Sequence, residues 1–313
     1  MSADTRTTRP IVAVVGPTAS GKSELGIALA LRLGGEVVNC DSVQVYREIE
    51  IATAKVPPGE RRGVPHHLID FVPPARAYTA ADWARDALAV IEQIEARGRT
   101  ALLVGGSGLY LRALREPFFE APPTDQGLRR RLLRLRERHG PEHLHGLLRR
   151  LDPERAARLQ PRDWARVQRA LELRLQTGEK LSSRLAARPA PPEQAARLRI
   201  FVLNPPREEL YRRIDLRAEA HFRAGLVEEV RGLLVRGVPA KTSALGAHGY
   251  RRAVEYLFGA RTLESAIEQT KLDVRHYAKR QVTWFRREPG VEWVEGFGED
   301  PRVQEEVARR LGL

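Results

Sequence analysis

A glycine-rich segment near the start of the chain has the residues needed to bind phosphate. Residues 16–23 match the pattern G-x-x-x-x-G-K-S completely. In such a loop, backbone N–H groups and a helix N-terminus surround phosphate oxygens, the lysine adds a full positive charge, and the last hydroxyl can bind Mg²⁺. The residues predicted to bind a diphosphate or triphosphate are Gly16, Pro17, Thr18, Ala19, Ser20, Gly21, Lys22 and Ser23, with Mg²⁺ at Ser23.

The acidic residue that usually accompanies such a loop is not in its usual place. ATPases and GTPases commonly hold the metal with an acid that follows an apolar strand, but the apolar run 100–104 ends in Gly105-Gly106-Ser107-Gly108. The run 36–40 does end in an acid, Asp41, and in a parallel sheet its carboxyl end shares an edge with the phosphate loop. Asp41 is therefore a candidate general base or metal-associated acid. Its position fits a helix cap or an Asx turn equally well.

A second glycine-rich turn, residues 105–110, is expected at the same edge of the sheet. Small residues there allow the backbone to approach a ligand closely, and the Ser107 hydroxyl can donate to a leaving-group oxygen. The turn alone is weak support for a function, because a turn that leads into a helix needs glycines in any case.

Alternating strands and helices must position these residues. Helical spacing of apolar residues follows the phosphate loop, and it recurs over residues 78–96 and through much of 207–286. Such alternation implies right-handed βαβ units, so the predicted fold class is α/β, with a mainly parallel sheet around a phosphate-loop core. The runs that predict buried strands are residues 11–15, 36–40, 100–104 and 198–203.

Strand signals disappear and arginine dominates after about residue 120. Residues 128–174 contain 14 Arg against six acidic residues, and their apolar residues recur at helical spacing. Proline-rich joints frame this part of the chain. We predict an all-helical insertion domain over residues 121–199, within a core formed by residues 1–120 and 200–313.

The whole chain is basic, with 53 Lys+Arg against 40 Asp+Glu in 313 residues and a formal charge of +13. This excess favours a polyanionic partner such as nucleic acid, because basic residues that neutralise phosphates release counterions. Only six of the basic residues are lysine, however, and so strong a preference for arginine also fits a bias in genome composition.

Composition excludes several other classes of protein. The single cysteine, Cys40, rules out an internal disulfide framework and a cysteine-rich zinc site, and we expect it to be buried on its strand. No apolar run approaches the roughly 18 residues that span a bilayer, and the first residues lack the apolar stretch of a signal peptide. We therefore expect a cytoplasmic protein with no membrane partner.

Two further groups have a simpler structural explanation than a functional one. His66 and His67 suggest a pair of metal ligands, but adjacent residues do not face one site on a helix, and no other ligands cluster with them. Trp284 and Phe285 could stack on nucleic-acid bases. Their helical spacing with Tyr277 instead favours a place in the core.

In combination, the motifs closely resemble those of the tRNA dimethylallyltransferases, also called tRNA isopentenyltransferases, over about residues 10–290. The phosphate loop alone is common to many enzymes, whereas the ordered set is specific. Besides residues 16–23 and 105–110, the set comprises Asp41-Ser42 with Tyr46, Ala52-Thr53-Ala54-Lys55, Pro65-His66-His67-Leu68-Ile69-Asp70, Arg169-Ala170-Leu171-Glu172, Gly249-Tyr250-Arg251 and Ala278-Lys279-Arg280-Gln281-Val282-Thr283-Trp284-Phe285.

The resemblance implies a core that holds dimethylallyl diphosphate with Mg²⁺ and a helical insertion that binds the tRNA anticodon stem-loop. The family transfers the five-carbon group to N6 of the adenosine at position 37, immediately 3′ of the anticodon. Lys22 and Ser23 keep their roles at the phosphates. Asp41 resembles the general base for the adenine amine, Ser107 takes the place of a Thr near the bridging oxygen, and Arg217 resembles a diphosphate-binding arginine.

The same resemblance implies contacts with tRNA. We expect the protein to be a monomer. Ser replaces the commoner Thr at positions 23 and 107, and His248 stands where Cys or Val is frequent. A C-terminal zinc finger of the eukaryotic kind is missing from the sequence, so the form is bacterial-like. The residues expected to contact tRNA are Asp41, Ser42, Val43, Gln44, Ser107, Arg129, Arg166, Arg169, Gly249, Tyr250 and Arg251.

Three other functions fit part of the sequence. A kinase or ATPase acting on a small molecule would use the same loop for ATP, and an enzyme that prenylates free AMP or ATP would share the whole site. A non-catalytic RNA-binding regulator would explain the arginines, but not why Asp41 and Ser107 flank a phosphate loop. The arginine-rich insertion favours tRNA as the acceptor.

Overall fold

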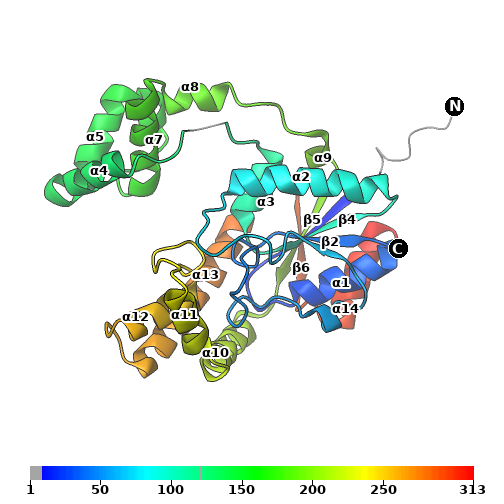
Figure 1. Ribbon diagram of the computed structural model, residues 1–313. Coiled ribbons are helices and arrows are strands. Elements are labelled where there is room, and N and C mark those ends of the chain that lie inside the picture. Colours follow the sequence, from blue (N-terminus) through cyan, green and yellow to red (C-terminus); the bar gives the residue numbers. More distant parts are fainter. Residues whose placement is uncertain (1–8, 120–121) are drawn as a thin grey trace. The chain divides into compact units, whose positions relative to one another are not determined.

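The computed structural model describes residues 9–119 and 122–313 and confirms the α/β fold class (Figure 1). Six strands form one parallel sheet in the order β3-β2-β4-β1-β5-β6. The strands are β1 (Ile11–Val15), β2 (Glu36–Asn39), β3 (His66–His67), β4 (Ala101–Gly105), β5 (Leu198–Asn204) and β6 (Val291–Glu295).

Contacts within the chain separate it into two compact units. We call residues 1–115 with 191–313 the core unit, and residues 116–190 the helical unit. The short helix α9 (Glu193–Ala196), which lies inside the predicted insertion, belongs to the core unit.

Helices cover both faces of the sheet in the core unit (Figure 1). Since neighbouring side chains of a strand point to opposite faces, Val12 and Val14 pack with residues of α1 and α14, whereas Ile11, Ala13 and Val15 pack with residues of α2 and α3. These helices are α1 (Lys22–Leu33), α14 (Pro301–Leu311), α2 (Ala80–Ala96) and α3 (Gly108–Arg115).

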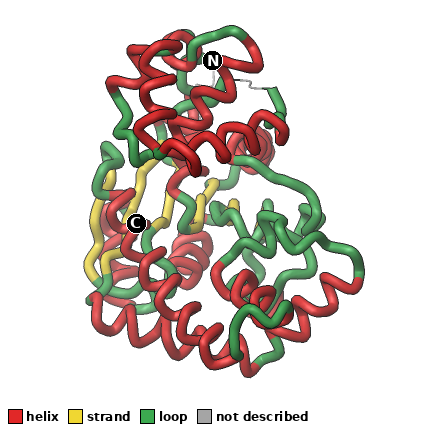
Figure 2. Tube along the Cα trace, turned by 90° about the vertical axis from the view of Figure 1, so that its left-hand side faces the viewer, coloured by secondary structure: helices red, strands yellow, loops and turns green. Residues whose placement is uncertain are grey.

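The remaining helices of the core unit confirm the helical interpretation of residues 207–286, and Figure 2 shows how much of the chain outside the sheet is helical. α11 ends at Val235 and α12 begins at His248, so residues 236–247 separate these two helices. These helices are α10 (Arg207–Arg223), α11 (Leu226–Val235), α12 (His248–Leu257) and α13 (Leu263–Phe285), and the 3-10 helix η2 (Pro58–Glu60) lies earlier in the chain.

The helical unit has a small apolar core of its own, built mainly from leucines such as Leu132, Leu148 and Leu171. Buried Asp152 joins two of its helices, because its carboxylate accepts from the backbone N–H groups of Arg155 and Ser182 and from the Ser182 hydroxyl. The helices are α4 (Gln126–His139), α5 (Pro141–Leu151), α6 (Pro153–Ala157), α7 (Trp164–Thr177) and α8 (Leu181–Ala186).

Over residues 9–119 and 122–313, no helix is both long enough and apolar enough to span a bilayer.

Candidate active site

The phosphate loop connects buried β1 to α1, as the motif predicts. Gly16 has φ +142°, and a Cβ there would lie 2.9 Å from the Leu203 carbonyl oxygen, so only glycine fits. Gly21, with φ +79°, precedes Lys22, the first residue of α1. No side chain of the described residues caps this helix, and the buried Ser20 hydroxyl has no hydrogen-bond partner among them. Free N–H groups and an unpaired hydroxyl are what a phosphate requires.

Two cations face the phosphate loop from different helices. Lys22 Nζ donates to the Pro17 carbonyl oxygen at 2.6 Å, and Arg217 of α10 donates to the Thr18 hydroxyl. Burial lowers the pKa of Lys22 to about 8, although the nearby Asp41 carboxylate opposes this shift. Burial also lowers the pKa of Arg217. Both shifts show that the cations are poorly solvated, which favours the binding of an anion between them.

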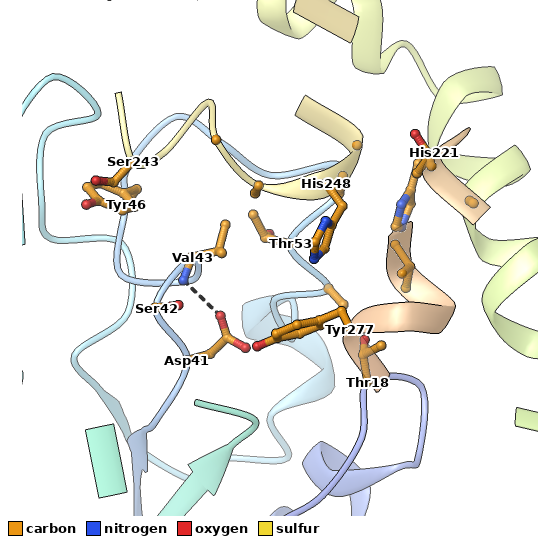
Figure 3. Close-up of a pocket in the computed structure, with 18 of the residues that line it drawn as sticks. Thr18, Asp41, Ser42, Val43, Tyr46, Thr53, His221, Ser243, His248 and Tyr277 are labelled. Atoms are coloured by element: carbon orange, nitrogen blue, oxygen red, sulfur yellow. Dashed lines mark hydrogen bonds between the residues drawn. The ribbon is translucent and has the colours of Figure 1, made fainter. Parts of the chain in front are cut away.

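Asp41 lies where β2 ends, and its two carboxylate oxygens have different surroundings. Oδ1 accepts from the backbone N–H groups of Val43 at 2.8 Å and Gln44 at 3.4 Å, which confirms the Asx-turn interpretation. The other oxygen faces the hydroxyl of Tyr277 (Figure 3). The turn therefore fixes the carboxylate and leaves one oxygen directed into the site.

Ser107 sits beside Asp41 at the end of β4. Its hydroxyl accepts from the Ser42 backbone N–H at 2.9 Å and forms a hydrogen bond with Tyr277. The glycines around it are required by packing, because a Cβ at Gly105 would overlap the Cys40 carbonyl group and one at Gly108 would overlap the Trp284 ring. Packing alone therefore accounts for these two glycines, and they give no evidence of a ligand.

Two cavities meet at Asp41. A cavity of about 200 Å³ lies over the phosphate loop and is lined by Lys22 and Ser23. A second cavity of about 480 Å³ is lined by His221 and His248. The residues that line both are Thr18, Asp41, Thr53, Ala54, Arg217 and Tyr277. A phosphorylated donor in the first cavity and an acceptor in the second would therefore meet at Asp41.

Helix α13 supplies two site residues that the sequence interpretation missed. Gln281 accepts from the Thr18 backbone N–H at 2.8 Å and donates to the Gly106 carbonyl oxygen at 2.9 Å, so it joins the two glycine-rich loops. Tyr277 lines both cavities. The available signal was the spacing of four between Tyr277, Gln281 and Phe285, which places two polar side chains on the face that carries a core residue.

Phe285 and Cys40 are fully buried, as predicted, and burial raises the pKa of the Cys40 thiol. Trp284 is half-buried, and the Arg112 guanidinium lies 4.2 Å from the centre of its ring. The two histidines make separate contacts, His66 with the Val64 carbonyl oxygen and His67 with Glu36.

The predicted tRNA-contacting segment at the start of α12 has an inner and an outer part. Tyr250 is fully buried, donates to Glu229 and accepts from the Ala52 backbone N–H at 3.3 Å, so its side chain supports the segment from within. Arg251 is exposed and pairs with Glu255.

In the helical unit, the three predicted RNA-binding arginines all pair with acids. Arg129 forms two hydrogen bonds with buried Glu172, at 2.7 and 2.9 Å, and Arg169 lies 3.6 Å from the same carboxylate. Arg166 pairs with Asp163 at 2.7 Å.

The parallel sheet, the phosphate loop at its edge and the carboxylate beside it define a phosphate-loop enzyme that joins a phosphorylated donor to an acceptor. Comparison with known proteins is more specific. The family model described as IPP transferase matches residues 44–288. The chain is 47% identical over 302 residues to the tRNA dimethylallyltransferase of Solibacter usitatus, covering 96% of this chain and 98% of that protein. The chain therefore belongs to the tRNA dimethylallyltransferase family of prenyltransferases, as the sequence motifs predicted.

Other relatives and solved structures agree with this assignment. The tRNA dimethylallyltransferase of Thermomicrobium roseum is 47% identical, over 97% of this chain and 92% of that protein. The tRNA isopentenylpyrophosphate transferase of Bacillus halodurans superimposes with a TM-score of 0.70 at 37% identity, over 97% of both chains. A eukaryotic dimethylallyltransferase acting on tRNA gives a TM-score of 0.78 at 28% identity, over 97% of this chain and 78% of that one.

Proposed function

We propose that this protein transfers the dimethylallyl group of dimethylallyl diphosphate to N6 of the adenosine at tRNA position 37. The adenine nitrogen bonds to the allylic C1 carbon, the bond from C1 to the diphosphate oxygen breaks, and diphosphate leaves with the bonding electrons. The proton lost from N6 passes to Asp41. N6-(dimethylallyl)adenosine and diphosphate are the products.

The phosphate-loop cavity is suited to the leaving group. As the C1–O bond breaks, negative charge accumulates on the diphosphate, and the N-terminus of α1, Lys22 and Arg217 all face that position. Loss of one such donor typically lowers a rate roughly 10²- to 10³-fold. We assign Gly16–Ser23 and Arg217 to the diphosphate, and Ser107 to its bridging oxygen.

Mg²⁺ fits the same cavity. The Ser23 hydroxyl lines it, and the unpartnered Ser20 hydroxyl adds a second oxygen of the kind that Mg²⁺ prefers. The ion would neutralise charge on the departing diphosphate, and Ser23 would hold it.

Asp41 is suited to act as the base, because the Asx turn holds one of its oxygens and leaves the other facing the junction of the cavities. A positioned general base contributes roughly 10²- to 10⁴-fold to a rate. The target adenine must leave its stack to reach this position, and the 480 Å³ cavity can receive it.

We assign the anticodon stem-loop to the helical unit together with residues 41–44 and the outer part of the 249–251 segment. Arg129, Arg166 and Arg169 retain exposed fractions of 43%, 68% and 37% despite their acidic partners. Each guanidinium has five N–H donors, so pairing with one carboxylate leaves donors for an RNA phosphate.

The observation that carries this proposal is the junction of two cavities at one carboxylate. Incubation with labelled dimethylallyl diphosphate and tRNA should place the label on one adenosine, identified by digestion and mass spectrometry. Asp41→Asn should bind diphosphate donor and tRNA normally but transfer roughly 10²-fold or more slowly. Undiminished transfer by Asp41→Asn would exclude Asp41 as the base.

Parallel reactions with AMP and with ATP alone separate the alternatives. Prenylation of AMP but not of tRNA would identify an enzyme that acts on the free nucleotide. Release of phosphate from ATP without an allylic substrate would indicate a kinase or ATPase. The second outcome is disfavoured by β4, which ends in Gly105 packed against Cys40 where an acid usually holds the metal.

A further inference from the structure

Tyr277 is a site residue to which the sequence motifs gave no role. It projects from α13 to the place where the two cavities join, and it lines both of them. Its hydroxyl points toward the free oxygen of Asp41 (Figure 3). Its ring lies against His248, with 5.1 Å between the ring centres. A purely structural tyrosine on this helix would have no need to direct its hydroxyl at the carboxylate.

The surroundings of the hydroxyl determine which way its proton points. Burial and the negative charge of Asp41 both raise the pKa of Tyr277, whereas a hydrogen bond with Ser107 opposes that shift. The phenol is therefore neutral and keeps its proton. The Ser107 hydroxyl already accepts from the Ser42 N–H at 2.9 Å, so its own proton is free to point at the tyrosine oxygen.

These contacts define a direction for a chain of donors. The Ser42 N–H donates to Ser107 and the Ser107 hydroxyl donates to Tyr277, which leaves the Tyr277 proton free to turn toward Asp41, the carboxylate that its hydroxyl faces in Figure 3. Hydrogen bonds to a charged acceptor are stronger than those between neutral groups.

We propose that Tyr277 is a positioning residue of the reaction centre, whose hydroxyl keeps the free oxygen of Asp41 directed at the acceptor amine. This role rests on the proposed function, since it requires Asp41 to be the base. The tyrosine itself exchanges no proton with the substrate.

Four proteins test this role in single-turnover reactions with saturating donor and tRNA: the wild type, Tyr277→Phe, Asp41→Asn and the double variant. Phe keeps the ring and its contact with His248 but removes the donor. We expect Tyr277→Phe to lower the rate constant about tenfold, with KM for both substrates unchanged. In the Asp41→Asn background, Tyr277→Phe should have little further effect, because the carboxylate through which Tyr277 acts is absent.

A second substitution gives an independent readout. 3-Fluorotyrosine at position 277 keeps the shape of the side chain and is a stronger hydrogen-bond donor, so its single-turnover rate constant should equal or exceed that of the wild type, whereas Tyr277→Phe lowers it.

Tyr256→Phe on α12 is the matched control, because its ring packs against the core and lines neither cavity. It should match the wild type in every measurement. A wild-type rate constant in Tyr277→Phe, or an equal effect of Tyr277→Phe in the wild-type and Asp41→Asn backgrounds, would overturn the role of Tyr277. If the wild type transfers no label to tRNA, or if Asp41→Asn is fully active, the proposed function has failed instead.

Discussion

At the scale of single residues, the phosphate cavity keeps two cations poorly solvated before any ligand arrives. Lys22 and Arg217 face the same loop, and burial disfavours the charged form of each. A bound diphosphate supplies the opposite charge and so stabilises the charged form of both side chains. The affinity of the free enzyme for its donor should thus depend on the protonation of Lys22, whose pKa is lowered to about 8.

This gives a prediction for the pH dependence of kcat/KM for dimethylallyl diphosphate, which reports ionisations of the free enzyme. Lys22 is charged below about pH 8 and becomes neutral as the pH rises through that value, so kcat/KM should fall on the alkaline side. In Lys22→Arg the charge persists, so the decline near pH 8 should disappear even if the absolute rate is lower. Lys241→Arg, at an exposed position, should retain the wild-type profile, and an unchanged profile in Lys22→Arg would assign the decline to another group.

At the scale of secondary-structure elements, the site depends on α13 joining loops that follow two different strands. Gln281 is 5% exposed and spans from the Thr18 N–H to the Gly106 carbonyl group. The phosphate loop follows β1 and the second loop ends β4, so this one amide fixes their spacing. Its position on a helix that also carries Tyr277 connects both parts of the reaction centre.

Gln281→Leu should weaken both the fold and the binding of the donor. Each buried backbone group left without a partner costs about 1–3 kcal/mol, so the free energy of unfolding should fall by at least that amount in denaturant titrations. KM for dimethylallyl diphosphate should rise, because Thr18 belongs to the phosphate loop. Gln269→Leu on the same helix should do neither, because among the described residues its amide bonds only Asp273, one turn away. Equal stability of the two variants would show that the Gln281 bridge is dispensable.

Two glycines in different packing environments should respond oppositely to alanine. At Gly105 a Cβ would overlap the Cys40 backbone between neighbouring strands, so Gly105→Ala should destabilise the core unit severely or prevent its folding. At Gly146 within α5 a Cβ would meet no atom within 4 Å, so Gly146→Ala should stabilise the helical unit by about 0.5–1 kcal/mol. Thermal unfolding of both variants measures the contrast. A well-folded Gly105→Ala protein would contradict the close packing at the end of β4.

The elements that the sequence predicted are those with a local signal. The strand over residues 11–15 was predicted with its observed bounds, β2 is one residue shorter than predicted, and β4 is shifted by one residue, because every residue of the three strands is buried and apolar residues fill most of their positions. β6 was missed, since Glu292 interrupts its apolar residues and pairs with Arg199 of the adjacent strand. The two-residue β3 exists through its pairing with β2 alone.

In the site, too, the residues that the sequence identified are those with a local signal. A local motif identified the phosphate loop, and the end of a predicted strand identified Asp41. Tyr277 and Gln281 lie more than two hundred residues further along the chain and reach the site only through the packing of α13. Their roles depend on which carbonyl, N–H or carboxylate they meet, and a helical spacing does not specify that.

At the scale of the whole molecule, the positive charge is organised into two kinds of arginine within the helical unit. Arg129, Arg166 and Arg169 are tied to acids, whereas the exposed Arg130, Arg131 and Arg134 of α4 form no salt bridge with a carboxylate of residues 9–119 or 122–313. Phosphates are the natural partners of such unpaired guanidinium groups. The acidic partners would hold the paired arginines in place. The unpaired arginines of α4 would neutralise tRNA phosphates and so account for most of the counterions released on binding.

Replacement of Arg130, Arg131 and Arg134 by alanine should therefore weaken tRNA binding and flatten its dependence on salt. The slope of log K against log salt should fall by about 0.7 to 0.9 for each phosphate that the variant no longer neutralises. Binding of dimethylallyl diphosphate should not change. The control removes the same charge from exposed Arg76, Arg85 and Arg302 of the core unit, which alters the net charge but not α4. An equal decrease of slope in both triple variants would mean that tRNA senses only the overall charge of +13 and makes no phosphate contacts along α4.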